Sequence, residues 1–145
     1  MILFSSEIEF EFRNKIKMNK LIMDVTSEKI FLMIISNANI YNITHENTKI
    51  NYEKLTIIIN DFLSSKKIKI SDINAIYINQ GSGRFAGIRN SISVVKAFNV
   101  AKNIDYYCYN LDDFKDEKDL SYENIPNLCK KYKIKKNLIN PIYIS

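Results

Sequence analysis

Residues 75–102 read AIYINQGSGRFAGIRNSISVVKAFNVAK, and this stretch decides the fold class. Residues 75–79 form a short apolar run with aromatic and β-branched side chains, which predicts a buried strand. The loop that follows contains Gly81 and Gly83. Residues 85–102 then carry apolar side chains around much of a helical wheel, which predicts a long helix. A strand, a glycine loop and a helix in this order are typical of an α/β unit.

The residues on either side of this unit complete an α/β pattern. Three apolar runs, at 21–23, 30–35 and 40–43, are separated by short polar turns and predict an antiparallel meander. Residues 51–65 place apolar side chains at helical spacing, which predicts one amphipathic helix. Residues 105–109 predict a last strand. The resulting order, βββαβαβ, indicates an α/β domain with a mixed sheet covered by helices.

The pattern divides the chain into three parts. Residues 1–17 do not join the later periodicity, and we treat them as an N-terminal extension. Residues 18–110 contain the predicted α/β lobe. Residues 111–145 begin as a charged connector, continue as a predicted short helix at 125–132, and end in an extended tail at 141–145.

Composition and charge limit the classes of function. The 145 residues are 46% hydrophobic and 26% charged, as in an ordinary globular domain. The net charge of +5 permits contact with an anion such as RNA but does not demonstrate it. No stretch reaches the ~18 apolar residues of a membrane span. Acidic side chains at Glu7, Glu9 and Glu11 interrupt any signal peptide, so we expect a cytoplasmic protein.

Few residues in the sequence suit metal binding or nucleophilic chemistry. Cys108 and Cys129 lie far apart without CxxC spacing, so they predict neither a zinc site nor a disulfide. His45 is the only histidine, and we expect it in an exposed surface loop. We therefore expect no catalytic residue, no metal and no cofactor.

Ordered blocks of the sequence resemble one known family. Residues 81–98, GSGRFAGIRNSISVVKAF, resemble the TsaB (YeaZ) signature GPGSFTGLRIGLATAKGL, with matches at Gly81, Gly83, Phe85, Gly87, Arg89 and Lys96. Upstream, LIMDVTSE at 21–28 resembles the opening strand of the family, LAIDTSTE. The last five residues, PIYIS, resemble its terminal PVYLR. The resemblance covers Met18 to about Asn110 and the end of the chain.

The resemblance implies both a fold and a role. The fold would be one actin-like (ribonuclease H-like) lobe of the ASKHA type, with the second lobe of the family largely missing. The role would be that of a non-catalytic scaffold in tRNA threonylcarbamoyladenosine (t6A) modification. Such a scaffold binds a TsaD-like protein, is joined by a TsaE-like ATPase and can pair as a homodimer. Contact with tRNA would then be indirect or weak.

Two sets of residues are candidate sites. On helix 85–102, small residues would let another helix approach closely, and the residues alone leave a core role and a partner role equally open. The resemblance implies a partner surface on the two helices, formed by Tyr52, Leu55, Ile57, Ile88, Arg89, Val94, Ala97, Phe98 and Ala101.

The second set is a vestigial phosphate-binding loop, made by Asp24, Thr26, Gly81, Ser82 and Gly83. In the alternative, structural interpretation, Asp24 accepts backbone hydrogen bonds from its own turn and Ser82 caps the helix. Two other functions also stay open. One is a minimal nucleotide-binding hydrolase that uses Asp24 and the glycine loop, and the other is a homodimeric interaction module unconnected with tRNA.

Overall fold

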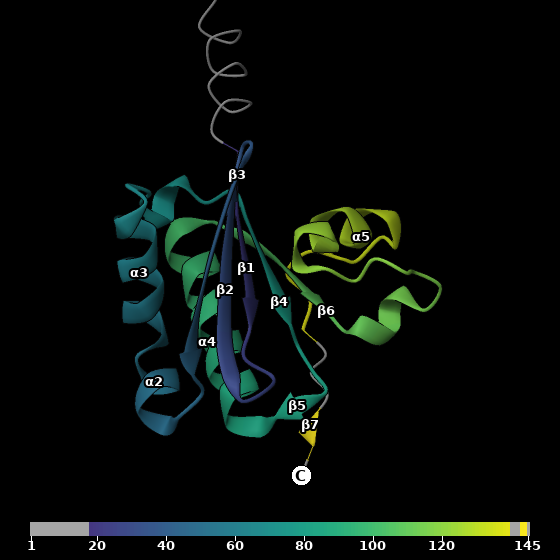
Figure 1. Cartoon of the computed structure of the whole chain (residues 1–145), viewed down its shortest axis with the longest axis horizontal. Coiled ribbons are helices and arrows are strands. Elements are labelled where there is room, and N and C mark those ends of the chain that lie inside the picture. Colours follow the sequence, from purple (N-terminus) through teal and green to yellow (C-terminus); the bar gives the residue numbers. More distant parts are fainter. Residues whose placement is uncertain (1–17, 140–142, 145) are drawn as a thin grey trace, which may run out of the picture.

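The computed structural model describes residues 18–139 and the strand at 143–144. Its centre is a five-stranded mixed sheet with strand order β3-β2-β1-β4-β6 (Figure 1). The first three strands pair antiparallel, whereas β1–β4 and β4–β6 are parallel. This confirms the predicted α/β class with a mixed sheet. The strands are β1 (Asn19–Asp24), β2 (Lys29–Ser36), β3 (Asn39–Glu46), β4 (Ala75–Asn79) and β6 (Asp105–Tyr109).

Both faces of the sheet are buried at its central strands. Because successive strand residues point to opposite faces, Leu21 and Met23 of β1 join one core cluster and Ile22 joins another. The β1–β2 register places Ile22 opposite Met33, which belongs to the same cluster. A sheet covered on both faces reads as a continuous apolar run, and this explains why LIM and IFLMII show little alternation.

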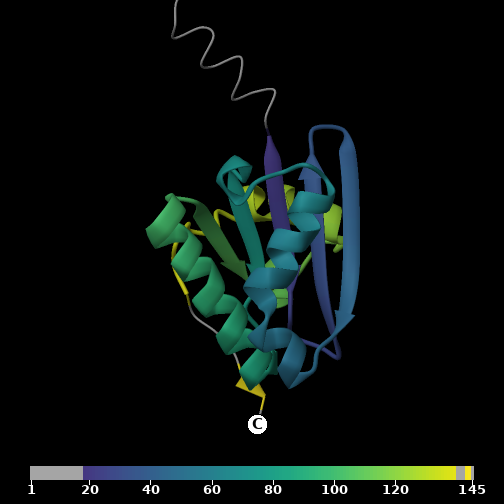
Figure 2. The same ribbon diagram turned by 90° about the vertical axis from the view of Figure 1, so that its left-hand side faces the viewer.

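Three helices cover the first face, as Figure 2 shows from the side. They are α2 (Lys49–Glu53), α3 (Leu55–Ser65) and α4 (Phe85–Lys102). The buried side of α4 includes Ile88, Ile92 and Val95, which pack in the larger core cluster. The helix ends at Asn103, whose left-handed φ of 55° forms the usual αL cap.

The segment after Asn110 covers the second face. It contains the 3-10 turns η2 (Leu111–Phe114) and η3 (Tyr122–Asn124) and the helix α5 (Ile125–Lys131). In the smaller core cluster, Phe114, Ile125, Leu128 and Cys129 pack against Ile22, Met33, Tyr77 and Tyr109 of the sheet. The domain therefore has three layers, with α2, α3 and α4 on one side of the sheet and α5 on the other (Figure 1). We call the segment from η2 to α5, residues 111–131, the third layer.

Three short elements complete the described part of the fold. The 3-10 turn η1 (Ile70–Asp72) leads into β4. The two-residue strands β5 (Gly83–Arg84) and β7 (Tyr143–Ile144) pair parallel, which brings the end of the chain beside the glycine loop. The predicted order βββαβαβ omits this pair. Of the expected extended tail, 143–144 is a strand and the remaining residues lie outside the described part.

Most predicted elements occur where expected. The strands 75–79 and 105–109 and the helix 85–102 have the predicted bounds, and the helix predicted at 125–132 is present as α5. The single helix predicted at 51–65 is wrong, because the chain bends at Lys54 (φ −100°, ψ 16°) between α2 and α3. No residue of α2 is fully buried, and its Tyr52 packs partly against the larger core cluster. The predicted extension, residues 1–17, lies outside the described residues.

Candidate functional site

The end of β1 carries a carboxylate that organises the turn after it. Asp24 Oδ1 accepts hydrogen bonds from the Thr26 backbone N–H, at 3.0 Å, and from the Thr26 hydroxyl, at 2.6 Å. A carboxylate that bonds the backbone two residues ahead is a common device for closing a tight turn. This confirms for Oδ1 the prediction that Asp24 accepts a backbone hydrogen bond from its own turn.

The second oxygen of Asp24 is held from the neighbouring parallel strand. Asn79, at the end of β4, donates its side-chain N–H to Asp24 Oδ2 at 3.1 Å. The Asn79 amide oxygen in turn accepts from the Gly81 backbone N–H, at 3.1 Å. Because β1 and β4 are parallel neighbours, their carboxyl ends meet at one edge of the sheet, which is where α/β proteins place their sites.

A tyrosine from the third layer completes the cluster. The Tyr122 hydroxyl donates to Asp24 Oδ2 at 2.8 Å, across 98 positions of sequence. Its ring stacks on Phe31 with 4.0 Å between ring centroids. Burial, followed by the nearby Asp24 charge, raises the pKa of Tyr122, so its hydroxyl remains a donor at neutral pH. Tyr122 carried no signal in the sequence, because its partner is set by tertiary packing alone.

These residues line a cleft of about 370 Å³. It contains the predicted Asp24, Thr26, Gly81 and Ser82, so the structure brings most of the second candidate set together. The remaining lining residues are Ser27, Asn79, Leu111, Asp112 and Tyr122. The cleft holds two carboxylates and no basic side chain among its lining residues, which disfavours a phosphate unless a cation accompanies it.

The fifth predicted residue, Gly83, has a packing role. A Cβ built on Gly83 would lie 2.4 Å from the Thr26 carbonyl oxygen, and one on Gly87 would lie 2.6 Å from the Val25 carbonyl oxygen. Both glycines let the start of α4 approach the β1–β2 turn closely. Gly81 has a φ of 134°, which glycine adopts without a steric penalty.

One predicted role in this loop is wrong. Ser82 does not cap α4, because the N-cap residue is Arg84 and no side chain caps the helix there. The helix starts two residues later than a Ser82 cap requires, since Gly83 and Arg84 instead form the short strand β5.

The proposed partner surface divides between core and exterior. Leu55 and Ile88 are fully buried, so neither can contact a partner and both leave the candidate set. The other predicted residues remain accessible: Ile57, Arg89, Ala97 and Ala101 are exposed, and Tyr52, Val94 and Phe98 are partly buried. The same layer exposes Ile50 and Val100, which the sequence interpretation missed. Val100 is 86% exposed, and it could have been found from its place on the side of α4 opposite to Ile88 and Val95.

The remaining candidate residues are structural. His45 lies on the edge strand β3 and is partly buried, so its expected place in an exposed loop is wrong. Cys108 and Cys129 are free and buried, and burial raises the pKa of each thiol to about 12. Among residues 18–139 and 143–144, no cluster of three or more His, Cys, Asp or Glu side chains could hold a metal ion.

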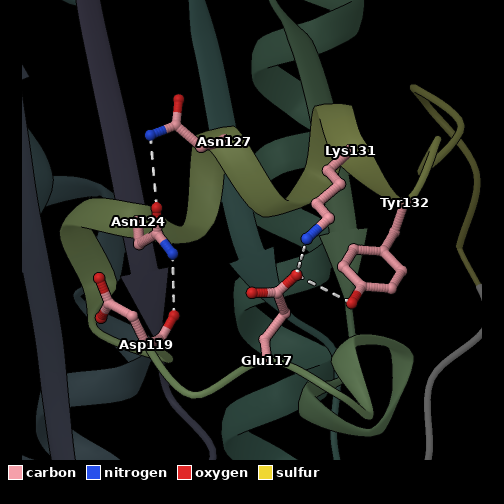
Figure 3. Close-up of polar contacts among 6 residues, drawn as sticks. All are labelled: Glu117, Asp119, Asn124, Asn127, Lys131 and Tyr132. Atoms are coloured by element: carbon pink, nitrogen blue, oxygen red, sulfur yellow. Dashed lines mark hydrogen bonds and ion pairs between the residues drawn. The ribbon is translucent and has the colours of Figure 1, made fainter.

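The lysine-rich stretch around α5 is partly neutralised within the third layer (Figure 3). Glu117 pairs with Lys131 and accepts a hydrogen bond from the Tyr132 hydroxyl at 3.0 Å. These contacts lower the pKa of Glu117, with the Lys131 hydrogen bond as the largest cause. Asn124 donates to the Asp119 backbone carbonyl at 2.9 Å and fixes the loop before α5.

Comparison with solved structures finds the same fold in part of YeaZ. YeaZ from Pseudomonas aeruginosa matches with a TM-score of 0.60 and 19% identity over 64% of this chain and 44% of YeaZ. A second structure, a P. aeruginosa protein with similarity to peptidase YeaZ, matches with the same TM-score and identity over 64% of this chain and 43% of its own. The resemblance read from the sequence is thus confirmed in the fold.

The likeness has a defined extent. The matched region spans less than half of either YeaZ structure. No protein-family model matches the sequence, and no curated protein matches it significantly. None of the helices in the described part of the chain is long and apolar enough to cross a membrane.

Proposed function

We propose that this chain is a non-catalytic scaffold that binds a TsaD-like protein in t6A modification of tRNA. The observation that carries the proposal is the accessible apolar surface over α2, α3 and α4, in a fold similar to YeaZ. Ile57 is 58% exposed and Val100 is 86% exposed, and Ala97 and Ala101 are small. Exposed apolar side chains beside small ones suit close packing of another helix.

The chemistry of the Asp24 cleft favours a scaffold over an enzyme. The Asp24 carboxylate accepts four hydrogen bonds from groups of the protein itself, and the residue is only 7% exposed. A group whose lone pairs are already used for structure is poorly placed as a general base or a metal ligand. The hydrolase alternative would need this carboxylate to be free.

The partner set follows from the proposed role. A TsaD-like protein would occupy the α2–α3–α4 surface, and a second copy of this chain would occupy it in the absence of TsaD. A TsaE-like ATPase would join the assembly, and contact with tRNA would pass mainly through TsaD. This role places the protein in the cytoplasm.

The test is a binding measurement with the TsaD-like protein from the same organism. Size-exclusion chromatography with light scattering should detect a heterodimer, and Ala97→Glu should weaken it by at least about tenfold, since a charge would be desolvated in the contact. Leu120→Glu, on the opposite layer and 40% exposed, is the matched control. No complex with the wild-type chain would refute the proposal.

The outcome with Ala97→Glu separates the remaining alternatives. A variant that folds and still binds TsaD with wild-type affinity removes α4 from the interface. A wild-type chain that forms only homodimers, lost in Ala97→Glu, favours the generic interaction module instead.

A further inference from the structure

A second cavity lies on the side of the sheet opposite to the helical surface, and it includes Lys20 near the start of β1, whereas the Asp24 cleft lies at the end of that strand. The second cavity has a volume of about 410 Å³ and opens between α5 and the strands β1, β4 and β6. In Figure 1, α5 lies over this side of the sheet. The cavity is lined by Lys20, Tyr77, Tyr107, Pro126, Asn127, Cys129, Lys130, Lys133 and Ile134.

The cavity is strongly basic. Lys20, Lys130 and Lys133 line it, and no carboxylate does. Within residues 18–139, none of these three lysines forms an ion pair, whereas their neighbours Lys131 and Lys136 pair with Glu117 and Asp105. Three lysines that line one cavity without an ion-pair partner make it attractive to an anion.

The rest of the wall is neutral and combines apolar side chains with Asn127 and two tyrosines. Tyr77 and Tyr107, opposite each other on β4 and β6, stack with 5.1 Å between ring centroids and 13° between ring planes. Burial, followed by the nearby Tyr107, raises the pKa of Tyr77, and burial is also the main cause that raises the pKa of Cys129 to about 12. Both groups are therefore neutral at neutral pH. The site offers cations for a phosphate and tyrosine, proline and isoleucine side chains for a flat apolar group.

We propose that this cavity binds a nucleotide through its phosphate, either as a free nucleotide or as one unit of single-stranded RNA. Its volume falls in the range of small-ligand sites, about 300–1,000 Å³. The contrast with the Asp24 cleft is informative, because that cleft is acidic and this one is basic. The inference is independent of the TsaD interface, which lies on the other layer.

The experiment uses the full chain and three probes: AMP, inorganic phosphate and a fluorescein-labelled pentaadenylate. Calorimetry measures the first two, and fluorescence anisotropy measures the third. We expect AMP to bind with a Kd below about 1 mM and more tightly than inorganic phosphate. Affinity should fall with added salt, as it does when lysines neutralise phosphates.

The variants Lys20→Gln, Lys130→Gln and Lys133→Asn each remove one charge. Asn is chosen for Lys133 because that residue has a φ of 54°, which Asn tolerates. Each should weaken binding at least about tenfold, as expected for the loss of one hydrogen bond between charged groups. Lys49→Gln, which removes an exposed lysine from α2 on the opposite layer, should leave binding unchanged. Thermal melts by circular dichroism confirm that each variant is folded.

The three probes distinguish a free nucleotide from RNA. Tight binding of AMP supports a free nucleotide, and binding of pentaadenylate without AMP supports RNA. The proposal is overturned if neither AMP nor pentaadenylate binds. It is also overturned if the three cavity variants bind as tightly as Lys49→Gln does. Inorganic phosphate binding as tightly as AMP overturns the nucleotide assignment. None of these results bears on the binding of TsaD.

Discussion

At the residue scale, Asp24 joins three segments that are far apart in the sequence. Its two carboxylate oxygens accept hydrogen bonds from Thr26 in the adjacent turn, Asn79 of β4 and Tyr122 of the third layer. Each hydrogen bond to a charged group contributes about 1.5–3 kcal/mol, and losing one partner leaves a buried charge less satisfied. The carboxylate thus contributes to holding the sheet and the third layer together.

The buried thiols predict how stability depends on pH. The pKa of Cys108 and Cys129 is raised from 9.0 to about 12 in the fold, mainly by burial. Above pH 9 the unfolded chain therefore binds fewer protons at these groups than the folded chain, so the free energy of unfolding should fall as pH rises from about 9 towards 12. Urea unfolding at several pH values measures this slope.

The Cys108→Ala, Cys129→Ala double variant is the control for that slope. The buried tyrosines titrate in the same direction, so the variant should still lose stability with pH, but less steeply than the wild type. Identical slopes for the two proteins would contradict the prediction.

Gly87 provides a test in which local propensity and packing oppose each other. In an exposed helix, Gly→Ala would stabilise by about 1 kcal/mol. Here the added Cβ would lie 2.6 Å from the Val25 carbonyl oxygen, so we expect Gly87→Ala to destabilise by about 1–3 kcal/mol. Chemical denaturation measures the difference. Ser93→Ala, exposed on the same helix, should change stability by less than about 0.5 kcal/mol, and a stabilised Gly87→Ala would disprove the close approach.

At the element scale, α4 has two different sides. Ile88, Ile92 and Val95 face the core, and Ala97, Val100 and Ala101 face outward. A helix that is apolar on both its buried side and its accessible side has an exposed apolar surface that a partner can bind.

Glutamate substitutions distinguish these two sides. Val95→Glu places a charge at a position with 0% exposure and should unfold the chain, because an unpaired buried charge costs several kcal/mol. Ala97→Glu should keep the wild-type melting temperature within a few degrees, since its surface change is worth less than about 0.5 kcal/mol. Circular dichroism melts of the isolated chain decide the question. Unfolding by Ala97→Glu would show that this side is also core.

At the scale of the whole molecule, the third layer is part of the core. Tyr77 and Tyr109 of the sheet are buried by Phe114, Ile125 and Leu128, which all come after Asn110. A chain that ended at Asn110 would expose this face to water, and each large side chain would lose about 1.5–3 kcal/mol of burial. The charged residues between them lie on the outside.

Phe114→Ala tests whether this layer contributes to stability. Phe114 is 1% exposed, so its removal should cost about 3–5 kcal/mol and lower the melting temperature sharply. Leu111→Ala in the same turn is the control, because Leu111 is 44% exposed and should cost less than about 1 kcal/mol. Equal, small effects of both substitutions would mean that the segment is only loosely attached.

The sequence alone determined the elements whose signal is local. Apolar runs and helical spacing depend on neighbouring residues, so β4, β6 and α4 were predicted with their observed bounds and β1, β2 and β3 were predicted in place but shorter than observed. The sequence also allowed the prediction that Asp24 and the glycine loop lie near one another, because parallel strands bring their carboxyl ends together. The break at Lys54 could not be predicted, because the apolar spacing of Tyr52, Leu55 and Ile59 continues across it.

Only the tertiary structure decided which residues meet across the layers. Tyr122 reaches Asp24 over 98 positions, and Lys20 joins Lys130 and Lys133 at one cavity, without any periodic signal in the chain. Leu55 and Ile57 lie two positions apart, yet one is fully buried and the other is 58% exposed. Such differences follow from how helices and the third layer pack on the sheet, because burial is a property of the assembled layers and not of the residue type.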